Sequence, residues 1–168
     1  MTPAATTTAA AARTFIGIGG NLGDARATVE DALRRLALLP GTTLSKQSRL
    51  YRTAPVDAGG DDYVNAVAQL DTMLTPHALL AALQAIELAH GRERPYRNAP
   101  RTLDLDILLY GDLQLAEDVL TLPHPRMAQR AFVLIPLLEI APEIAIPGVG
   151  AARDFLVQVQ GQAIELLP

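Results

Sequence analysis

The chain has 168 residues, with 14 Lys and Arg against 18 Asp and Glu, and it contains no Cys and no Trp. A chain of this length forms one domain and buries roughly 70% of its unfolded surface, so it needs neither a disulfide nor a structural zinc. The absence of Cys excludes both and favours a reducing compartment, so we expect a cytoplasmic protein.

Its charge and hydropathy exclude two classes of partner. No apolar run approaches the roughly 20 residues of a membrane-spanning helix, which predicts a soluble protein with no membrane partner. A net charge of -4 excludes a general nucleic-acid binder, which needs a basic surface to neutralise phosphates. The net charge does not exclude a local anion-binding site.

The first half of the chain alternates strands with helices. Residues 1–12 are small and uncharged and predict a disordered tail before a single domain at 13–168. A strand is expected at 13–18, and Asp24 is placed to cap a helix in which Val29, Leu33 and Leu36 form the buried stripe. Further strands are expected at 44–52 and 63–70, the second with one core face and one partly polar face, followed by a helix from 75 to 91.

The second half begins with a strand at 103–110, in which Leu103, Leu105, Ile107 and Leu109 are expected on one face. The turn at Gly111 predicts a hairpin with a partner strand at 113–120. A mostly helical segment at 126–140 and a last helix near 151–160 complete the order. This order predicts an α+β fold, a ferredoxin-like antiparallel sheet flanked by helices in three α/β/α layers.

The strand at 103–110 carries the most informative motif, Asp104-Leu105-Asp106. Residues two apart in a strand project to the same face, so both carboxylates emerge together. Oxygen ligands without His or Cys suit Mg²⁺. The alternative is a pair of aspartates on a solvent-facing strand, neutralised by Arg.

Basic side chains surround this motif. The arginines Arg92, Arg94, Arg97 and Arg101 lie immediately upstream of it, and His124 and Arg130 follow downstream. Arginine forks recognise phosphates, and a metal pair with a cationic loop is what phosphoryl transfer needs. Alone, the arginines would be a solvated loop and His124 a hydrogen-bonding loop residue.

Two weaker features lie in the first half. The run Gly19-Gly20-Asn21-Leu22-Gly23 connects a strand to a helix, where backbone N–H groups can bind phosphate, although the sequence favours a simple strand-to-helix turn. Tyr63 and Asn65 share the non-core face of their strand, and an aromatic plane beside an amide would suit a flat heterocycle.

Taken in order, these residues resemble the family of 6-hydroxymethyl-7,8-dihydropterin pyrophosphokinases. The runs PRTLDLDIL (100–108) and LPHPR (122–126) are highly specific. Further matching stretches lie at 18–23, 51–56, 62–65, 87–94 and 130–134.

The resemblance implies transfer of diphosphate from ATP to the hydroxymethyl group of the reduced pterin, giving AMP, in folate biosynthesis. It implies catalytic roles for Arg92, Arg101, Asp104 and Asp106, with two Mg²⁺ ions held by Asp104 and Asp106. The residues implied for ATP are Gln84, Glu87, Arg94, Ile107, Thr121, His124 and Arg130. Those implied for the pterin are Thr53, Pro55, Tyr63, Asn65 and Phe132. We expect a monomer with these two small molecules as its partners.

The chain departs from the family pattern at Gly20, Ala54 and the pair Asn98-Ala99, which puts closure of the loop in question more than the chemistry. No general base can be assigned, since a metal-bound Asp106 would have little basicity. Two other hypotheses stay open: a sugar-nucleotide transferase that uses its Asp-Leu-Asp motif, and a non-catalytic module that binds a nucleotide or a pterin.

Overall fold

The computed structural model describes residues 10–21, 24–54, 62–91 and 103–168. Ten strands, three α-helices and two 3-10 helices are assigned in these ranges. The helices are α2 (Ala25–Ala37), α3 (Pro76–Gly91), α4 (Ala131–Ile140), η1 (Met127–Gln129) and η2 (Ala152–Val159). The strands of the main sheet are β1 (Ala12–Gly20), β2 (Thr42–Gln47), β3 (Tyr51–Thr53), β4 (Tyr63–Thr72), β5 (Leu103–Tyr110) and β10 (Ile164–Leu166). Two small ribbons pair β6 (Leu115–Ala116) with β7 (Thr121–Leu122), and β8 (Ala145–Ile146) with β9 (Gly150–Ala151).

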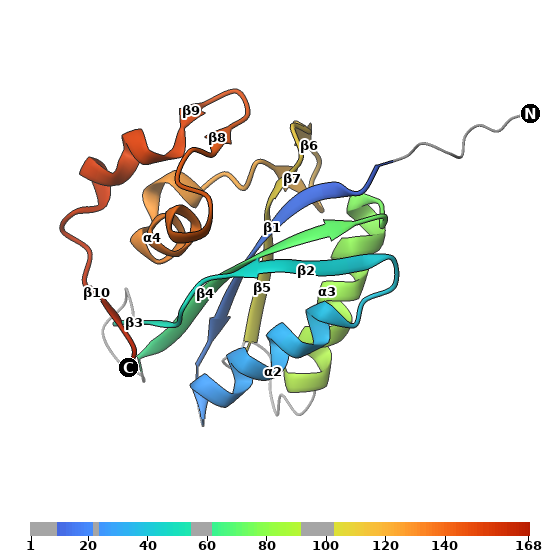
Figure 1. Ribbon diagram of the computed structural model, residues 1–168, viewed down its shortest axis with the longest axis horizontal. Coiled ribbons are helices and arrows are strands. Elements are labelled where there is room, and N and C mark those ends of the chain that lie inside the picture. The colour runs from blue at the N-terminus through green and yellow to red at the C-terminus, as the bar shows by residue number, and fades with distance from the viewer. Residues whose placement is uncertain (1–9, 22–23, 55–61, 92–102) are drawn as a thin grey trace, which may run out of the picture.

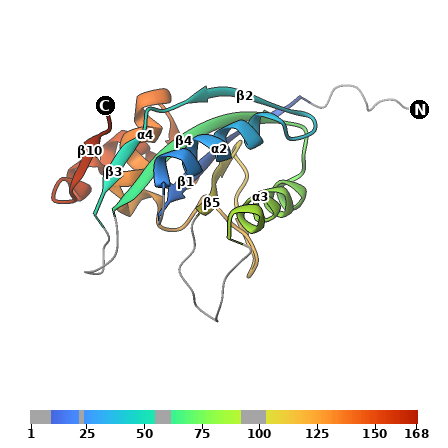
Figure 2. The ribbon, with the colours of Figure 1, turned by 90° about the horizontal axis from the view of Figure 1, so that it is seen from below.

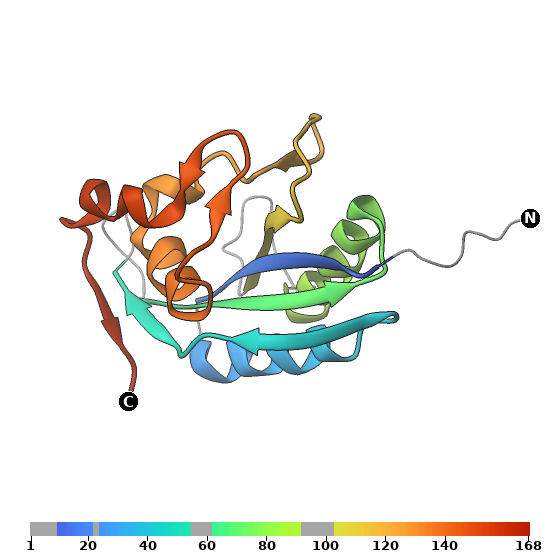
Figure 3. The same ribbon diagram turned by 45° about the horizontal axis from the view of Figure 1, so that its top comes forward.

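The main sheet is antiparallel, in the order β10-β3-β4-β1-β5, and β2 also pairs with β4. Helices α2 and α3 cover one face, and α4 with η2 covers the other, so the molecule has three layers (Figures 1 and 3). Figure 2 shows α3 and α4 toward opposite ends of the molecule. The predicted α+β class with a ferredoxin-like sheet is confirmed.

Two buried clusters hold the layers together. Between the sheet and α2/α3 lie Ile16 and Ile18 of β1, together with Val29, Leu33 and Leu36, as the helical spacing predicted. On the other face, Phe15 and Val67 pack with the apolar side of α4. The alternation of β1 between these clusters follows from the two-residue period of a strand.

The helix starts also follow the sequence. Asp24 accepts a hydrogen bond from Ala27 N at 3.0 Å, so it caps α2 as predicted. Thr75 Oγ1 likewise accepts from Ala78 N at 3.2 Å at the start of α3. The predicted helix at 151–160 is present as the 3-10 helix η2. Among the described residues, no helix is both long enough and apolar enough to cross a bilayer.

The predicted hairpin between 103–110 and 113–120 is wrong. After Gly111 the chain leaves the sheet, and β6 pairs with β7 instead of β5. The edge of β5 is already engaged by α3, because Leu105 N donates to Glu87 Oε2 at 2.7 Å. A helix side chain therefore takes a position that a partner strand would need.

Three other expectations need correction. The strand expected at 44–52 is two strands, β2 and β3, which both pair with β4. Between them, Val67 N of β4 donates to the Ser48 hydroxyl at 2.9 Å, and this side-chain bond interrupts the backbone pairing. Leu109 does not share a face with Leu103, because a β-bulge opposite Phe15 and Ile16 reverses the alternation and moves Leu109 into the α4 cluster.

The third correction concerns β4. Its second face was expected to be partly polar and outside the core, yet Asn65, Val67 and Gln69 are all buried. The physical reason is α4, which packs against this face of β4. Polar side chains on that face are therefore enclosed between two layers instead of facing solvent.

Candidate active site

The strand register places one row of residues across the α4 face of the sheet. Tyr51 pairs with Asn65, Asn65 with Gly19, and Gly19 with Asp104. Directly paired residues share a face, so these four positions run from β3 through β4 and β1 to β5. Two strand spacings separate Asn65 from Asp104, about 10 Å of backbone. Because Gly19 has no side chain, nothing from β1 rises between them.

A second row lies beside the first. Gly17 pairs with Val67 on one side and with Asp106 on the other. Both β1 residues that lie between β4 and the aspartates are therefore glycines. A Cβ built on Gly19 would lie 3.2 Å from Asn65 Nδ2, which is closer than ordinary packing allows. Gly19 therefore leaves the floor between the Asn65 amide and Asp104 free of a β1 side chain, whereas the Leu108 side chain fills the space over Gly17, where a Cβ would lie 3.3 Å from it.

The amide of Asn65 is held by Thr53. Thr53 Oγ1 donates to Asn65 Oδ1 at 2.8 Å, and both residues are buried. This bond directs the Asn65 NH₂ group away from Thr53, and the Gly19 contact places that group over the floor. Tyr63 is paired with Thr53 at the end of β4 and is partly exposed. The predicted neighbours Thr53, Tyr63 and Asn65 are thus brought together.

The carboxylates of Asp104 and Asp106 are on the same face of β5, as predicted, and both residues are exposed. Their neighbours Leu103, Leu105 and Ile107 point to the opposite face and are buried. Within the described ranges, no group of three or more His, Cys, Asp and Glu gathers as a complete metal cage.

His124 lies in the loop after β7, close enough to Asp106 for the charge of that carboxylate to act on its ring. Its backbone N donates to Leu108 O at 2.9 Å, which ties the loop to β5. Burial lowers the pKa of His124; the negative charge of Asp106 opposes that change, and Arg130 and Arg126 reinforce it. His124 Nδ1 accepts from Arg126 N at 3.1 Å, so the neutral ring carries its proton on Nε2. Nε2 can then donate to an anion.

Arg130 and Phe132 stand at the start of α4. The Arg130 guanidinium lies over the Phe132 ring, with Cζ 5.4 Å from the ring centre, a cation–π geometry. Both residues are partly exposed. They carry one cation and one aromatic face on the side of the sheet where Asn65 and the aspartates lie.

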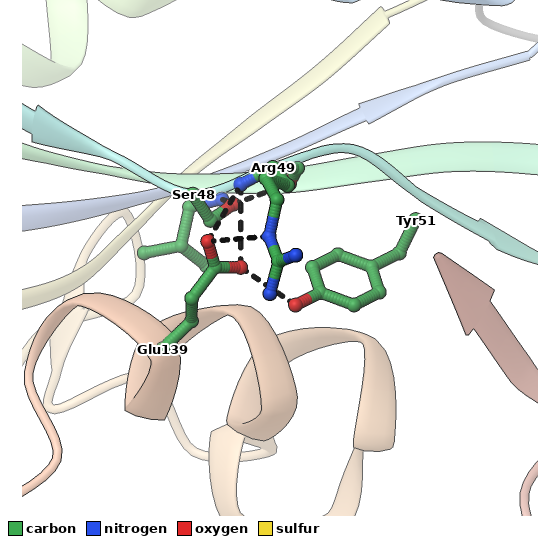
Figure 4. A network of polar contacts seen from close by, with 5 residues as sticks. Ser48, Arg49, Tyr51 and Glu139 are labelled. Carbon is green, nitrogen blue, oxygen red and sulfur yellow. Dashed lines mark hydrogen bonds and ion pairs between the residues drawn. The ribbon is translucent and has the colours of Figure 1, made fainter. Parts of the chain in front are cut away.

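The other end of α4 is fixed to the sheet by a polar network that the sequence did not reveal (Figure 4). Glu139 accepts hydrogen bonds from Arg49 N, from Arg49 Nε at 3.1 Å and from Tyr51 Oη at 2.6 Å. Burial and this carboxylate raise the pKa of Tyr51 to about 12. Burial would raise the pKa of Glu139, but the hydrogen bonds from Tyr51 and Arg49 outweigh it and lower that pKa.

Other predicted site residues lie around this centre. Gln84 is exposed on α3, while Glu87 binds the backbone of Leu105, between the two aspartates. Ile107 is buried in the α2/α3 cluster, which leaves its backbone, not its side chain, for any nucleotide contact. Thr121 is exposed on β7, in the ribbon that contacts β5.

Four of the predicted residues lie outside the described ranges: Arg92, Arg94, Arg101 and Pro55. The residues that the sequence did not single out are Gly17, Tyr51, Glu139 and Gln162, the last of which accepts a hydrogen bond from Ala131 N at the start of α4. Of these, only Gly17 carried a local signal, since a glycine alternating with Gly19 inside a strand indicates a close approach of another group.

Two carboxylates, a histidine and an arginine on one face of a ferredoxin-like sheet have the chemistry that a site for a phosphorylated substrate requires. The family model described as 7,8-dihydro-6-hydroxymethylpterin-pyrophosphokinase (HPPK) matches residues 15–142. The chain therefore belongs to this family.

Curated relatives agree. The chain is 42% identical to the 2-amino-4-hydroxy-6-hydroxymethyldihydropteridine pyrophosphokinase of Methylorubrum extorquens, over 91% of this chain and 97% of that one. It is 44% identical to the protein of the same name from Pseudomonas aeruginosa, over 93% and 97%. Family membership at this coverage removes the sugar-nucleotide transferase and the non-catalytic module.

Solved structures support the fold. A Plasmodium falciparum HPPK-DHPS triple mutant with SDX-DHP superposes with a TM-score of 0.72 at 15% identity, covering 94% of this chain. A second structure, HPPK-DHPS in complex with substrates, gives a TM-score of 0.68 at 12% identity, over 88% of this chain. The chain spans 46% and 43% of these two longer proteins.

Proposed function

We propose that the α4 face of the sheet is where this pyrophosphokinase transfers diphosphate from ATP to the hydroxymethyl group of 6-hydroxymethyl-7,8-dihydropterin, giving AMP and the pterin diphosphate, a step of folate biosynthesis. One observation carries the assignment of the site. A single row across the sheet, Asn65, Gly19 and Asp104, joins a buried amide to an exposed carboxylate over a floor without side chains.

The amide end of this row suits the pterin. Asn65 is fixed by Thr53 and presents its NH₂ group over the floor, where it can donate to an acceptor on the ring edge. Phe132 from α4 and Tyr63 from β4 supply aromatic faces for a flat ring. A buried, prearranged amide also discriminates strongly, because an analogue that lacks the matching group leaves it unpaired. Pro55 is proposed here from the family motif alone.

The carboxylate end suits the triphosphate. Arg130 and the Nε2 proton of His124 can bind phosphate oxygens, and the N-terminus of the ten-residue helix α4 adds a favourable dipole. The proposed nucleotide contacts of Gln84, Glu87, Ile107 and Thr121, and those of Arg92, Arg94 and Arg101, rest on the family motifs.

The donor set fits Mg²⁺. Mg²⁺ is ordinarily bound by one or two carboxylates together with phosphate oxygens and water, not by a complete protein cage. Asp104 and Asp106 are two exposed carboxylates on one face of β5. We propose that they hold two Mg²⁺ ions, which would neutralise phosphate charge when bound.

The chain's own residues then act mainly by positioning. Transfer forms a bond from the hydroxymethyl oxygen to the β-phosphorus, breaks the bond from that phosphorus to the oxygen bridging to AMP, and releases the hydroxyl proton to water. Asn65 and Phe132 place the hydroxymethyl group, while Arg130 and His124 orient the phosphates. Holding two reactants in line can supply several kcal/mol of the barrier, about 7–11 in well-oriented cases. We further propose that the enzyme is cytoplasmic and that it works as a monomer. Analytical ultracentrifugation tests the oligomeric state directly.

The deciding experiment separates the chemistry from background hydrolysis. The protein is mixed with Mg²⁺, ATP and the hydroxymethyl dihydropterin, and AMP is followed, with the pterin omitted as the control. We expect AMP only in the complete mixture, and a loss of at least about 100-fold in Asp104→Asn and in Asp106→Asn. Formation of ADP, or AMP production that survives both substitutions, refutes the assignment.

A further inference from the structure

Arg130 occupies a position for which arginine is poorly suited. It is the N-cap residue of α4, with an extended backbone (φ -125°, ψ 116°), and its own side chain makes no capping hydrogen bond. Ser, Thr, Asp or Asn is preferred at this position because a short side-chain oxygen can accept from the first backbone N–H groups. An arginine has no acceptor to offer. The start of α4 therefore needs an acceptor from another part of the chain.

Gln162, from the segment after η2, supplies that acceptor. Ala131 N donates to Gln162 Oε1 at 2.9 Å, and Gln162 Nε2 donates to Gln129 O at 2.8 Å. One side-chain amide thus bridges the two residues on either side of Arg130. Both ends of the amide are used, so a shorter amide or a side chain without one would lose at least one of the two bonds.

The bridging side chain is itself anchored. Gln162 N donates to Val159 O at 3.0 Å, and Val159 is buried. Two residues after Gln162, Ile164 pairs with Thr53 as β10 joins β3. Figure 3 shows this path, from η2 above the sheet down to β10 at its edge. The segment consequently connects the start of α4 to the strand that carries Thr53.

In this arrangement, one residue caps the helix and another presents a charged side chain at the start of α4. Gln162 satisfies the helix start, and the Arg130 side chain lies over Phe132, outside any capping contact. We propose that Gln162 is a positioning residue of this enzyme, which holds the backbone on both sides of Arg130 so that the guanidinium meets the ATP phosphates. The proposal rests on the ATP-binding role of Arg130 proposed above, and Gln162 lies beyond residues 15–142, the part that matches the family model.

The test measures affinity for a non-hydrolysable ATP analogue by calorimetry, in the presence of Mg²⁺ and well below the melting temperature. Gln162→Ala and Gln162→Asn are each expected to weaken binding about fivefold to tenfold, the equivalent of about 1 to 1.4 kcal/mol. Thr75→Ala is the matched control, because it removes one hydrogen bond from the start of another helix, α3. Thr75→Ala is expected to lower the melting temperature about as much as Gln162→Ala does, and to leave the affinity for the ATP analogue unchanged.

Arg130→Ala completes a double-mutant cycle. If Gln162 acts through Arg130, adding Gln162→Ala to Arg130→Ala weakens binding no further. Additive losses overturn the positioning role, as does a Gln162→Ala protein that binds as well as Thr75→Ala. If Arg130→Ala alone leaves the affinity unchanged, the ATP-binding role proposed for Arg130 is wrong. This outcome is distinct from the additive losses that would refute the positioning role of Gln162.

Discussion

Replacing Glu139 with alanine tests whether the polar network of Figure 4 holds α4 on the sheet. The carboxylate accepts from the backbone and the guanidinium of Arg49 and from the hydroxyl of Tyr51. Only 22% of the Glu139 side chain is exposed, and Tyr51 is 7% exposed. Removing the carboxylate therefore leaves the Tyr51 hydroxyl without a hydrogen-bond acceptor in a place that water hardly reaches.

The magnitude follows from which donors can be rehydrated. Arg49 is 65% exposed, so water replaces much of what its groups lose. The bond from Tyr51, at 2.6 Å, is made to a charged acceptor and is worth about 1.5–3 kcal/mol. We therefore expect Glu139→Ala to lower the free energy of unfolding by about 2–3 kcal/mol. For a domain of this length that corresponds to a fall of about 5–10 °C in the melting temperature.

Thermal unfolding followed by circular dichroism checks this value, with Glu143→Ala as the matched control. Glu143 also forms a 2.6 Å ion pair, with Arg153, but its side chain is 79% exposed. Exposed pairs contribute little, so the control should change the melting temperature by less than about 2 °C. If the two variants unfold at the same temperature, the network does not hold α4 and the reasoning from burial is wrong.

Three further outcomes are expected. Because the pKa of Tyr51 is raised to about 12, its share of the stability is present below pH 10 and is lost as the pH rises toward 12; Tyr51→Phe should flatten this alkaline decline in urea titrations. Because the pKa of Glu139 is lowered, its share is present above about pH 4.5 and is lost at lower pH, so Glu139→Gln should flatten the acid limb. Gly19→Ala should weaken pterin binding at least about fivefold by displacing the amide of Asn65, and an unchanged pterin affinity would contradict the role given to Gly19.

Local patterns determined a large part of this protein. The three α-helices, the cap at Asp24 and the alternation of β1 follow from interactions within a few residues, so composition and spacing predict them. The shared face of Asp104 and Asp106 follows from the two-residue period of a strand. The family motifs then joined these carboxylates to residues far away in the chain.

Tertiary packing decided the rest. The bulge that moved Leu109 to the α4 face and the helix side chain that took the edge of β5 depend on partners distant in sequence. The alignment of Asn65, Gly19 and Asp104 depends on the register of three strands, which only the whole sheet sets. The capping of α4 by Gln162 could not be predicted, because its 31-residue separation from Ala131 leaves no local pattern and the contact exists only once η2 and β10 have packed. The sequence by itself thus determined which chemical groups are present and on which elements, and the folded chain decided which of them meet.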